Sequence, residues 1–354
     1  MRWFLRIFFT LILIIGVSVL SYSTLEYLLS APPQKEAVQL EIPEKTSVQG
    51  IGQLLEENGL IRESRLFVPY VWLKGETQNF RPGIYELQPG DGIHQIVSTL
   101  TDRRHAITIP EGFTVEKVAN RMEAKGIDRE GFLKAVDHAE YDYSFVKEIP
   151  NNEGRTHRLE GYLFPSTYSF PEGTHPEITV DIMLRQFEKR LLAEGVKEKL
   201  EERGLTVDEW VTIASMVQQE GQVEEELPRI AGVIYNRLEK GMKLQLDATV
   251  QYALPETKER LYYKDLKIDS PYNTYLYEGL PPGPIANPGD PALQAALEPE
   301  EHNYLFYVTR KDGSGLHYFA ETEEEHNKNV EKSKLEQQKR EQQQKEKDEE
   351  KTSD

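Results

Sequence analysis

Glu220 stands at the end of an apolar helical pattern, in the segment IASMVQQEGQ that covers residues 213–222. At 100° per residue it falls within about 20° of Ile213 and about 60° of Val217, which places it on the apolar side of the predicted helix. Apolar surroundings and the negative end of a helix dipole both raise the pKa of a carboxyl group. A glutamic acid that stays protonated near neutral pH can donate a proton to a leaving oxygen. The pattern therefore indicates either a general acid or an ordinary, partly exposed residue at a helix end.

The helix that would carry Glu220 has recognisable ends. Thr206 is a favourable N-cap, and Glu209 three residues later completes a capping box. Gly221 is suited to end the helix directly after Glu220. These signals predict one helix between Thr206 and Gly221 with the acid on its last turn.

Other polar residues follow in the next predicted helices. Arg237 comes seven residues after Ile230, so it lies on the inner face of its helix and needs a partner such as an acid or a substrate oxygen. Asn236 lies beside it. Asp247 is favoured as the cap of a helix that starts at Ala248, and the alternative is a second catalytic carboxylate.

A long loop, residues 269–297, contains six prolines and the segment SPYNTYLY. Its length without a helical or strand pattern indicates a functional loop. Tyr272, Asn273 and Tyr275 combine flat stacking surfaces with hydrogen-bonding groups, which N-acetylated sugars require. The alternative is that the tyrosines are packing anchors.

Several common kinds of site are absent from the sequence. The histidines lack a metal-binding spacing, and there is neither a G-x-S-x-G motif nor a phosphate-binding loop, so no cofactor and no metal are predicted. Glu224–Glu226 fit the first turn of the following helix, and His317 is interpreted as structural. A net charge of -18 argues against nucleic acid as a partner.

The N-terminus contains an uncharged apolar run from Ile7 to Leu25. Its length is close to the roughly 20 residues that span a bilayer. Arg2 and Arg6 precede the run and Glu26 follows it, which predicts a single-pass anchor with a cytoplasmic N-terminus. A cleaved signal peptide is the alternative. Both interpretations place the rest of the chain outside the cytoplasm.

An internal repeat follows. IPEKTSVQGIGQLLEENGLI starts at residue 42 and IPEGFTVEKVANRMEAKGI at residue 109, and a shorter relative, YELQPGDGIHQIVSTL, starts at residue 85. Each reads as a strand, a turn and an amphipathic helix, capped in the two longer copies by Ser47 or Thr114 and stopped by Gly59 or Gly126. The units resemble LysM modules, which bind glycans that contain N-acetylglucosamine; the alternative is plain α+β packing units.

Five blocks in order carry a resemblance to a known enzyme family: LEGYLFPSTY, IASMVQQE, VIYNRLEKGMKLQLDATVQYAL, SPYNTYLYEGLPPGPIANPG and EEHNKNV. Together they resemble the endolytic murein transglycosylases, the MltG or YceG-like proteins. The family pattern A-S-(I/L)-V-E-K-E appears here as ASMVQQE, so Gln218 replaces its first glutamate and Glu220 matches the catalytic one. The resemblance implies a membrane-anchored enzyme of the cell membrane that cleaves nascent peptidoglycan between N-acetylmuramic acid and N-acetylglucosamine and leaves a 1,6-anhydro end.

The resemblance also implies roles for residues and partners. Glu220 would be the catalytic acid and base. The predicted substrate-binding residues are Asn236, Arg237, Gln245, Asp247, Ser270, Tyr272, Asn273 and Tyr275. The expected partners are peptidoglycan glycan strands, penicillin-binding proteins and cell-wall synthesis complexes. Two alternatives remain, a glycan-binding scaffold without catalysis and a hydrolytic muramidase with Asp247 as its second carboxylate.

The predicted fold class is α+β, with an N-terminal transmembrane helix, LysM-like strand–helix repeats and a mixed α+β catalytic domain. Residues 331–354 contain one apolar side chain, Leu335, and are predicted to be a charged, disordered tail. The predicted divisions are an anchor over 1–29, a linker over 30–40, the LysM-like region over 41–135, the catalytic domain over 136–330 and the tail over 331–354.

Overall fold

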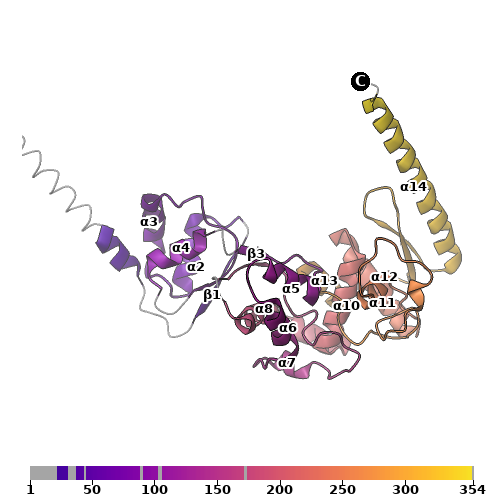
Figure 1. Cartoon of the computed structure of the whole chain (residues 1–354), viewed down its shortest axis with the longest axis horizontal. Coiled ribbons are helices and arrows are strands. Elements are labelled where there is room, and N and C mark those ends of the chain that lie inside the picture. The colour runs from indigo at the N-terminus through magenta and orange to yellow at the C-terminus, as the bar shows by residue number, and fades with distance from the viewer. Residues whose placement is uncertain are drawn as a thin grey trace, which may run out of the picture. The chain divides into compact units, whose positions relative to one another are not determined.

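The computed structural model describes residues 22–30, 37–43, 45–87, 91–102, 106–170 and 174–352. The chain is divided into two compact units: unit 1 contains residues 1–109 and 166–174, and unit 2 contains residues 110–165 and 175–354 (Figure 1). This division differs from the predicted boundary at residue 135. Helices and small sheets occur together, so the predicted α+β class is confirmed.

Unit 1 combines a mixed four-stranded sheet with helices. Its elements are β1 (Val38–Ile42), α2 (Val48–Glu57), η1 (Ser64–Leu66), α3 (Phe67–Lys74), β2 (Gly83–Leu87), α4 (Ile93–Thr101), β3 (Ala106–Thr108) and β4 (Thr167–Ser169), and residues 22–29 are also helical. The strand order is β1-β2-β4-β3, with β2 and β4 parallel and the other two pairs antiparallel. β1 begins inside the segment that was predicted to be a linker.

The strand–turn–helix units predicted from the repeat are confirmed as local structures. Ser47 caps α2 and Thr114 caps α5 (Val115–Glu123), and each side-chain oxygen accepts the backbone N–H three residues later. Gly59 and Gly126 follow these helices with φ angles of 69° and 83°, in the left-handed region that glycine adopts easily. Sequence patterns therefore located the helices of both long copies.

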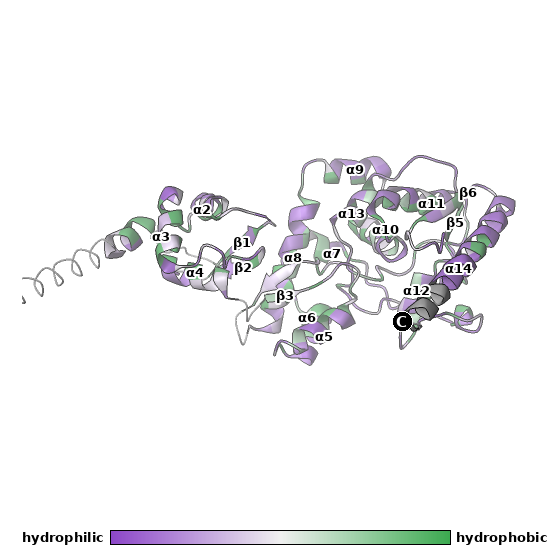
Figure 2. Cartoon of the chain, turned by 90° about the horizontal axis from the view of Figure 1, so that it is seen from above, coloured by the Kyte–Doolittle hydropathy of each residue, from purple (hydrophilic) through white to green (hydrophobic). Residues whose placement is uncertain are grey.

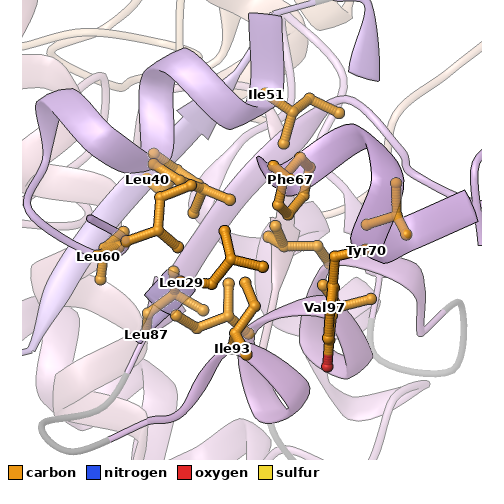
Figure 3. Close-up of a cluster of buried hydrophobic side chains, with 14 of the residues drawn as sticks. Leu29, Leu40, Ile51, Leu60, Phe67, Tyr70, Leu87, Ile93 and Val97 are labelled. Atoms are coloured by element: carbon orange, nitrogen blue, oxygen red, sulfur yellow. The ribbon is translucent and has the colours of Figure 1, made fainter. Parts of the chain in front are cut away.

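A hydrophobic core holds unit 1 together (Figure 3). In β1 the buried residues are Leu40 and Ile42, two positions apart, as expected for a strand with one face inward. Full burial of each such side chain is worth about 1.5–3 kcal/mol. Figure 3 shows the core side chains Leu29, Leu40, Ile51, Leu60, Phe67, Tyr70, Leu87, Ile93 and Val97 converging.

Residues 7–21 of the predicted membrane anchor lie outside the described part of the chain. The rest of the apolar run, residues 22–25, belongs to the helix over 22–29, and Tyr22 and Leu25 pack against the core of unit 1. Among the described helices, none is long and apolar enough to cross a bilayer.

Unit 2 is mostly helical. Its elements are α5 (Val115–Glu123), α6 (Arg129–His138), α7 (Ser144–Glu148), α8 (Pro176–Leu191), α9 (Val196–Arg203), α10 (Val207–Glu220), η2 (Glu224–Glu226), α11 (Leu227–Glu239), α12 (Asp247–Ala253), η3 (Asp265–Lys267), α13 (Asp290–Leu297), β5 (Phe306–Thr309), β6 (His317–Ala320) and α14 (Glu323–Thr352).

Helix α10 packs against α11, α12 and α13, which are grouped around it in Figure 1. Its residues 210–217 are all buried. Two hydrogen bonds attach it to the long proline-rich loop and to α13: Trp210 Nε1 donates to the Leu293 carbonyl at 2.9 Å, and Ser215 Oγ accepts the Ile285 N–H at 3.0 Å. Burial of residues 210–217 and these two hydrogen bonds therefore fix the position of α10.

The long loop is shorter than the sequence pattern predicted. Its last eight residues form α13, with Pro291 in the first turn, where the missing N–H of proline costs no hydrogen bond. The apolar side chains that follow are buried against α10. Tertiary packing therefore stabilises a helix in a segment that its proline content predicted to be a loop.

The C-terminal segment contradicts the predicted disorder, because α14 is helical to Thr352. Its first part packs on the hairpin of β5 and β6, which is confirmed as predicted. Ser333 is buried and donates to the Thr309 carbonyl, and the Tyr318 hydroxyl donates to Glu336 at 2.6 Å. The helix is largely hydrophilic (Figure 2), so contact with the hairpin and pairs such as Lys328–Glu324 support it.

Glu160 is fully buried in unit 2 and joins three segments. Its carboxylate accepts the N–H of Val115 at the start of α5 (3.0 Å), the hydroxyl of Tyr252 on α12 (3.0 Å) and the amide of Asn287 before α13 (3.5 Å). Burial raises its pKa from 4.5 to about 7. The folded state therefore favours the protonated form, and ionisation of Glu160 works against folding.

This shift predicts a pH-dependent stability. Because the folded-state pKa is raised, the stabilisation is fully present below pH 4.5 and is lost as the pH rises through about 7. The loss from Glu160 is expected to reach about 3 kcal/mol, at about 1.4 kcal/mol per pKa unit. The free energy of unfolding is measured by urea denaturation at each pH from 4 to 8. In Glu160→Gln it should fall less between pH 4 and 8 than in wild type, while the exposed control Glu202→Gln should show the wild-type pH dependence. An unchanged pH dependence in Glu160→Gln would contradict the assignment.

Candidate active site

A cleft of about 690 Å³ lies beside the C-terminal end of α10 in unit 2. Its walls come from α10, α11, α12, the hairpin strands β5 and β6, and the first turn of α14. Glu220 lines the cleft, together with both apolar and polar side chains. The acid singled out from the helical pattern is therefore in the position where a substrate could reach it.

Helix α10 begins and ends where the sequence predicted, with Thr206 as its N-cap and Gly221 as its C-cap. The predicted capping box is present, with Thr206 and Glu209 bonding each other's backbone N–H groups. Gly221 has an ordinary φ of -88°, so its freedom to adopt unusual angles is not used. A Cβ atom at residue 221 would instead lie 2.1 Å from Leu227 Cδ2. Glycine at 221 thus lets α11 approach the end of α10 closely.

The carboxyl group of Glu220 has an unusual proton affinity. Part of the side chain reaches solvent, yet the protein atoms around the carboxyl group raise its pKa from 4.5 to about 7, and the charge of Asp247 acts in the same direction. The Tyr307 hydroxyl and the Ala248 N–H oppose this shift. Near neutral pH the group is therefore divided between protonated and ionised forms, as general acid–base catalysis requires.

Tyr307 on β5 is the direct partner of Glu220. Its hydroxyl donates to Glu220 Oε2 at 3.0 Å. The Tyr307 ring lies edge-on to the ring of His317, 5.4 Å away. His317 is held by the buried Glu226. Glu226 Oε2 forms a hydrogen bond with His317 Nδ1 at 2.9 Å and accepts the backbone N–H of His317 at 3.0 Å. Glu226, His317 and Tyr307 therefore form a series of contacts that ends at the acid.

Four of the predicted substrate-binding residues line the same cleft: Arg237, Gln245, Asp247 and Tyr275. Two of them touch, because the Tyr275 hydroxyl donates to Asp247 Oδ1 at 2.6 Å. Asp247 is the first residue of α12 and faces the cleft. Gln245 has a φ of 52°, a strained value for a residue with a side chain.

Arg237 finds partners that the sequence could not identify. Nε donates to the carbonyl of Leu305 at 2.6 Å, and Nη1 donates to those of Lys243 at 3.2 Å and Leu244 at 2.8 Å. Within the described part of the chain no carboxylate forms an ion pair with it. Burial lowers the pKa of Arg237. The guanidinium therefore connects α11 to the residue before β5 and to the loop before α12 at the edge of the cleft.

The other four predicted residues lie in the surrounding loops. Asn236 donates to the carbonyls of His302 and Tyr304. The remaining three sit in the segment after η3: Ser270 Oγ accepts the Tyr272 N–H, Tyr272 is buried, and buried Asn273 accepts the Tyr275 N–H. They shape the loop that presents Tyr275, and their contact with substrate stays a prediction.

Two neighbouring glutamines have structural bonds. Gln218 Oε1 accepts the Gly289 N–H at 2.9 Å, and Gln219 Nε2 donates to the Gly112 carbonyl at 2.8 Å. These bonds connect the end of α10 to the segments before α13 and α5. Neither carries an acid, so Glu220 is the carboxyl group that the last turn of α10 contributes to the cleft.

Tyr307, Glu226 and His317 were not identified as site residues from sequence. Glu226 was interpreted as a helix cap, and it is buried and paired with His317. The sequence contained one useful signal. Side chains alternate between the two faces of a predicted hairpin, and Tyr307 and His317 occur on its two paired strands, so their proximity could have been predicted. The pattern could not show which face meets α10.

Comparison with known proteins agrees with this architecture. Residues 40–332 match the sequence model of the YceG-like family. A Bacillus subtilis (strain 168) protein named endolytic murein transglycosylase is 35% identical over 311 residues, covering 84% of this chain and 85% of that protein. A Streptococcus pneumoniae (strain D39) protein of the same name is 33% identical over 324 residues, covering 84% of this chain and 58% of that protein.

A solved structure is similar as well. The crystal structure of a YceG-like protein from Listeria monocytogenes matches with a TM-score of 0.59 and 36% sequence identity. The match covers 83% of this chain and 99% of the other.

Proposed function

Because this chain belongs to the YceG-like family, we propose that it is an endolytic murein transglycosylase, a lytic transglycosylase that acts on nascent peptidoglycan. It cleaves the β-1,4 bond between N-acetylmuramic acid and N-acetylglucosamine, leaves a 1,6-anhydro end and so terminates strand elongation. The observation that carries the proposal is Glu220, a carboxyl group with a pKa of about 7 at the side of a large cleft.

The reaction needs one group that first gives and then takes a proton. Protonated Glu220 donates its proton to the glycosidic oxygen as the bond from that oxygen to C1 of the muramic acid breaks. The resulting carboxylate accepts the proton of the C6 hydroxyl of the same sugar, and the hydroxyl oxygen forms a bond to C1. Glu220 is then protonated again. The nucleophile belongs to the substrate, so its attack benefits from proximity and no water has to be activated.

Neighbouring groups support both steps. The Tyr307 hydroxyl keeps the carboxyl group in one orientation through its hydrogen bond at 3.0 Å. Asp247 carries a negative charge in the same cleft, and Tyr275 holds it through the 2.6 Å hydrogen bond. A fixed negative charge stabilises the positive charge that develops near C1 in the transition state.

The position of Asp247 also favours a second candidate, a hydrolytic muramidase. Ordinary glycosidases use two carboxyl groups, one as acid and one as base or nucleophile. Glu220 and Asp247 line one cleft and influence each other electrostatically. The two candidates differ in their products, since hydrolysis yields reducing ends.

Product analysis tests the proposal. Purified full-length protein is incubated with glycan strands, and the products are identified by mass spectrometry. Fragments with 1,6-anhydro-N-acetylmuramic acid ends are expected. Reducing ends would support the muramidase instead, and an absence of cleavage would support a glycan-binding scaffold.

The role of Tyr307 predicts a shift in the pH profile. Activity requires protonated Glu220, so the rate should fall as the pH rises through about 7. Tyr307→Phe removes a donor that lowers this pKa, and the alkaline limb should move to higher pH. The maximal rate should fall about tenfold, because the loss of one charge-assisted hydrogen bond raises the activation free energy by about 1.4 kcal/mol. Cleavage rates from pH 5 to 9 test this, with Tyr304→Phe as a control outside the cleft. A shift to lower pH would refute the role.

The remaining parts of the proposal rest on sequence. The apolar run Ile7–Leu25 is a single-pass anchor in the cell membrane, with the N-terminus in the cytoplasm and the chain after the anchor outside it. The strand–helix units of residues 41–135 are LysM-like and hold the glycan strand. Penicillin-binding proteins and cell-wall synthesis complexes supply that strand. Protease treatment of intact cells tests the topology, because only an externally exposed chain is cleaved.

A further inference from the structure

Helix α3 has an exposed apolar face. Its sequence, FVPYVWLK, contains no charged residue before Lys74. The buried residues, which face the core of unit 1, are Phe67, Tyr70 and Val71. The other side, which we call the outer face of α3, consists of the exposed residues Val68, Pro69, Trp72 and Leu73. Trp72 is 71% exposed and Leu73 is 58% exposed. A helix at the surface of a soluble domain normally presents polar residues to water, so an apolar outer face indicates contact with a partner.

The helix over residues 22–29 lies beside α3 and shares this feature. The Tyr22 ring stacks on the Tyr70 ring with centroids 6.0 Å apart, and Lys74 Nζ lies 4.9 Å from the centre of the Tyr22 ring. The first turn of this helix therefore contacts the last turns of α3, and the two helices are neighbours in both views (Figure 1, Figure 2). Tyr27 is 71% exposed and Leu28 is 47% exposed. Two neighbouring helices of unit 1 thus expose large apolar side chains.

The same helix leaves no linker between the predicted anchor and unit 1. The sequence predicted a linker over residues 30–40, after this helix, yet Leu29 is fully buried and Leu25 packs against the core. Unit 1 is therefore already folded from residue 22 onwards. Only residues 7–21 of the apolar run remain, and a transmembrane helix of that length measures about 22 Å, against about 30 Å for the apolar part of a bilayer. No spare chain can separate Tyr22 from the membrane surface.

We propose that the outer face of α3 lies in the extracytoplasmic leaflet of the membrane, at the boundary between head groups and acyl chains. This inference rests on the proposed anchor. Trp72 has the type of side chain that is enriched at this depth, Leu73 beside it is apolar, and Lys74 adds a positive charge at the end of the same helix. Unit 1 then has two connections to the bilayer, the anchor and α3. Together they fix which side of unit 1 faces the membrane, which the anchor alone would leave free to rotate.

Fluorescent labels on single cysteines test the depth of α3. The chain contains no cysteine, so each substitution creates one labelling position. Full-length Leu73→Cys, labelled with nitrobenzoxadiazole, is placed in nanodiscs of phosphatidylcholine and phosphatidylglycerol. Lipids with a doxyl group near the head group should quench the label about twofold or more, because an interfacial helix buries its apolar face in that layer. Iodide in the water should quench it weakly. Gln53→Cys, at an exposed position of α2, is the matched control and should show the opposite behaviour.

A label at Ile14→Cys, inside the apolar run, tests the anchor separately. If doxyl lipids quench the label at residue 14 while iodide quenches the label at residue 73, the anchor stands and the lipid contact of α3 is refuted; the outer face would then belong to a protein partner. If iodide quenches the label at residue 14 while doxyl lipids quench the label at residue 73, the anchor fails and the lipid contact stands.

A second variant shows whether α3 itself, rather than the label, enters the lipid. With the label at Val68→Cys, the added substitution Trp72→Ser should lower doxyl quenching about twofold or more, because the main interfacial side chain is lost. Circular dichroism should stay unchanged, since Trp72 is exposed and leaves the core intact. Equal doxyl quenching with and without Trp72 would overturn the proposed contact.

Discussion

Glu220→Gln is expected to lower the rate of strand cleavage by about 10³-fold or more, because general acid–base catalysis alone contributes about 10²–10⁴-fold and here one group serves both steps. Glutamine has nearly the same shape as glutamic acid and can still accept the Tyr307 hydroxyl. It has no proton to give to the glycosidic oxygen and cannot take one from the C6 hydroxyl. Binding of the strand should persist.

Release of anhydro-ended fragments, followed by mass spectrometry at pH 6, measures the effect. Glu202→Gln on α9 makes the same charge change at an exposed position and should leave the rate unchanged. Thermal unfolding should show that Glu220→Gln is at least as stable as wild type, since a neutral side chain replaces an acid whose ionisation is disfavoured in the folded state. Full residual cleavage by Glu220→Gln would remove the basis of the proposed mechanism.

The elements around Glu220 could be predicted because their signals are local. The capping box at Thr206 and the apolar periodicity of α10 act over three or four residues, and the structure confirms both. The same holds for the Ser47 and Thr114 caps and for the hairpin of β5 and β6. Where the local pattern and the tertiary environment agree, the sequence alone was sufficient to locate the helix, cap or hairpin.

The partners of the acid depend on contacts between distant segments. Tyr307 is 87 residues from Glu220, and Glu226 is 91 residues from His317. Periodicity states which face of an element is apolar, but it does not state which element covers that face. His326 illustrates the limit: it belongs to the EEHNKNV block, yet only the structure shows that it lines the cleft and stacks on Phe306.

Tertiary packing also overrode local composition. Proline content suggested a loop where α13 forms, and charge suggested disorder where α14 forms. In both cases one face of the helix is covered by a neighbour, α10 for α13 and the hairpin for α14. A single sequence contains no direct record of such a neighbour.

Gly161→Ala is expected to destabilise unit 2 by about 2–5 kcal/mol, which combines about 1–3 for overpacking with about 1–2 for a left-handed backbone. Gly161 has a φ of 91°, and a Cβ atom there would lie 2.5 Å from Pro284 Cβ and 2.8 Å from Val211 Cγ1. Both neighbours are constrained, because Val211 is buried in α10 and proline cannot rotate away. The clash therefore pushes on the helix that carries Glu220.

Gly204→Ala separates the two contributions. Gly204 also has a positive φ, 64°, at the end of α9, but no atom of the described residues lies within 4 Å of the added Cβ. It should lose only about 1–2 kcal/mol, the backbone part alone. Urea denaturation followed by circular dichroism compares the variants, and strand cleavage should fall in Gly161→Ala but not in Gly204→Ala. Equal destabilisation of both would mean that the contacts with Pro284 and Val211 relax freely. In that case the close approach at Gly161 would not fix the position of α10.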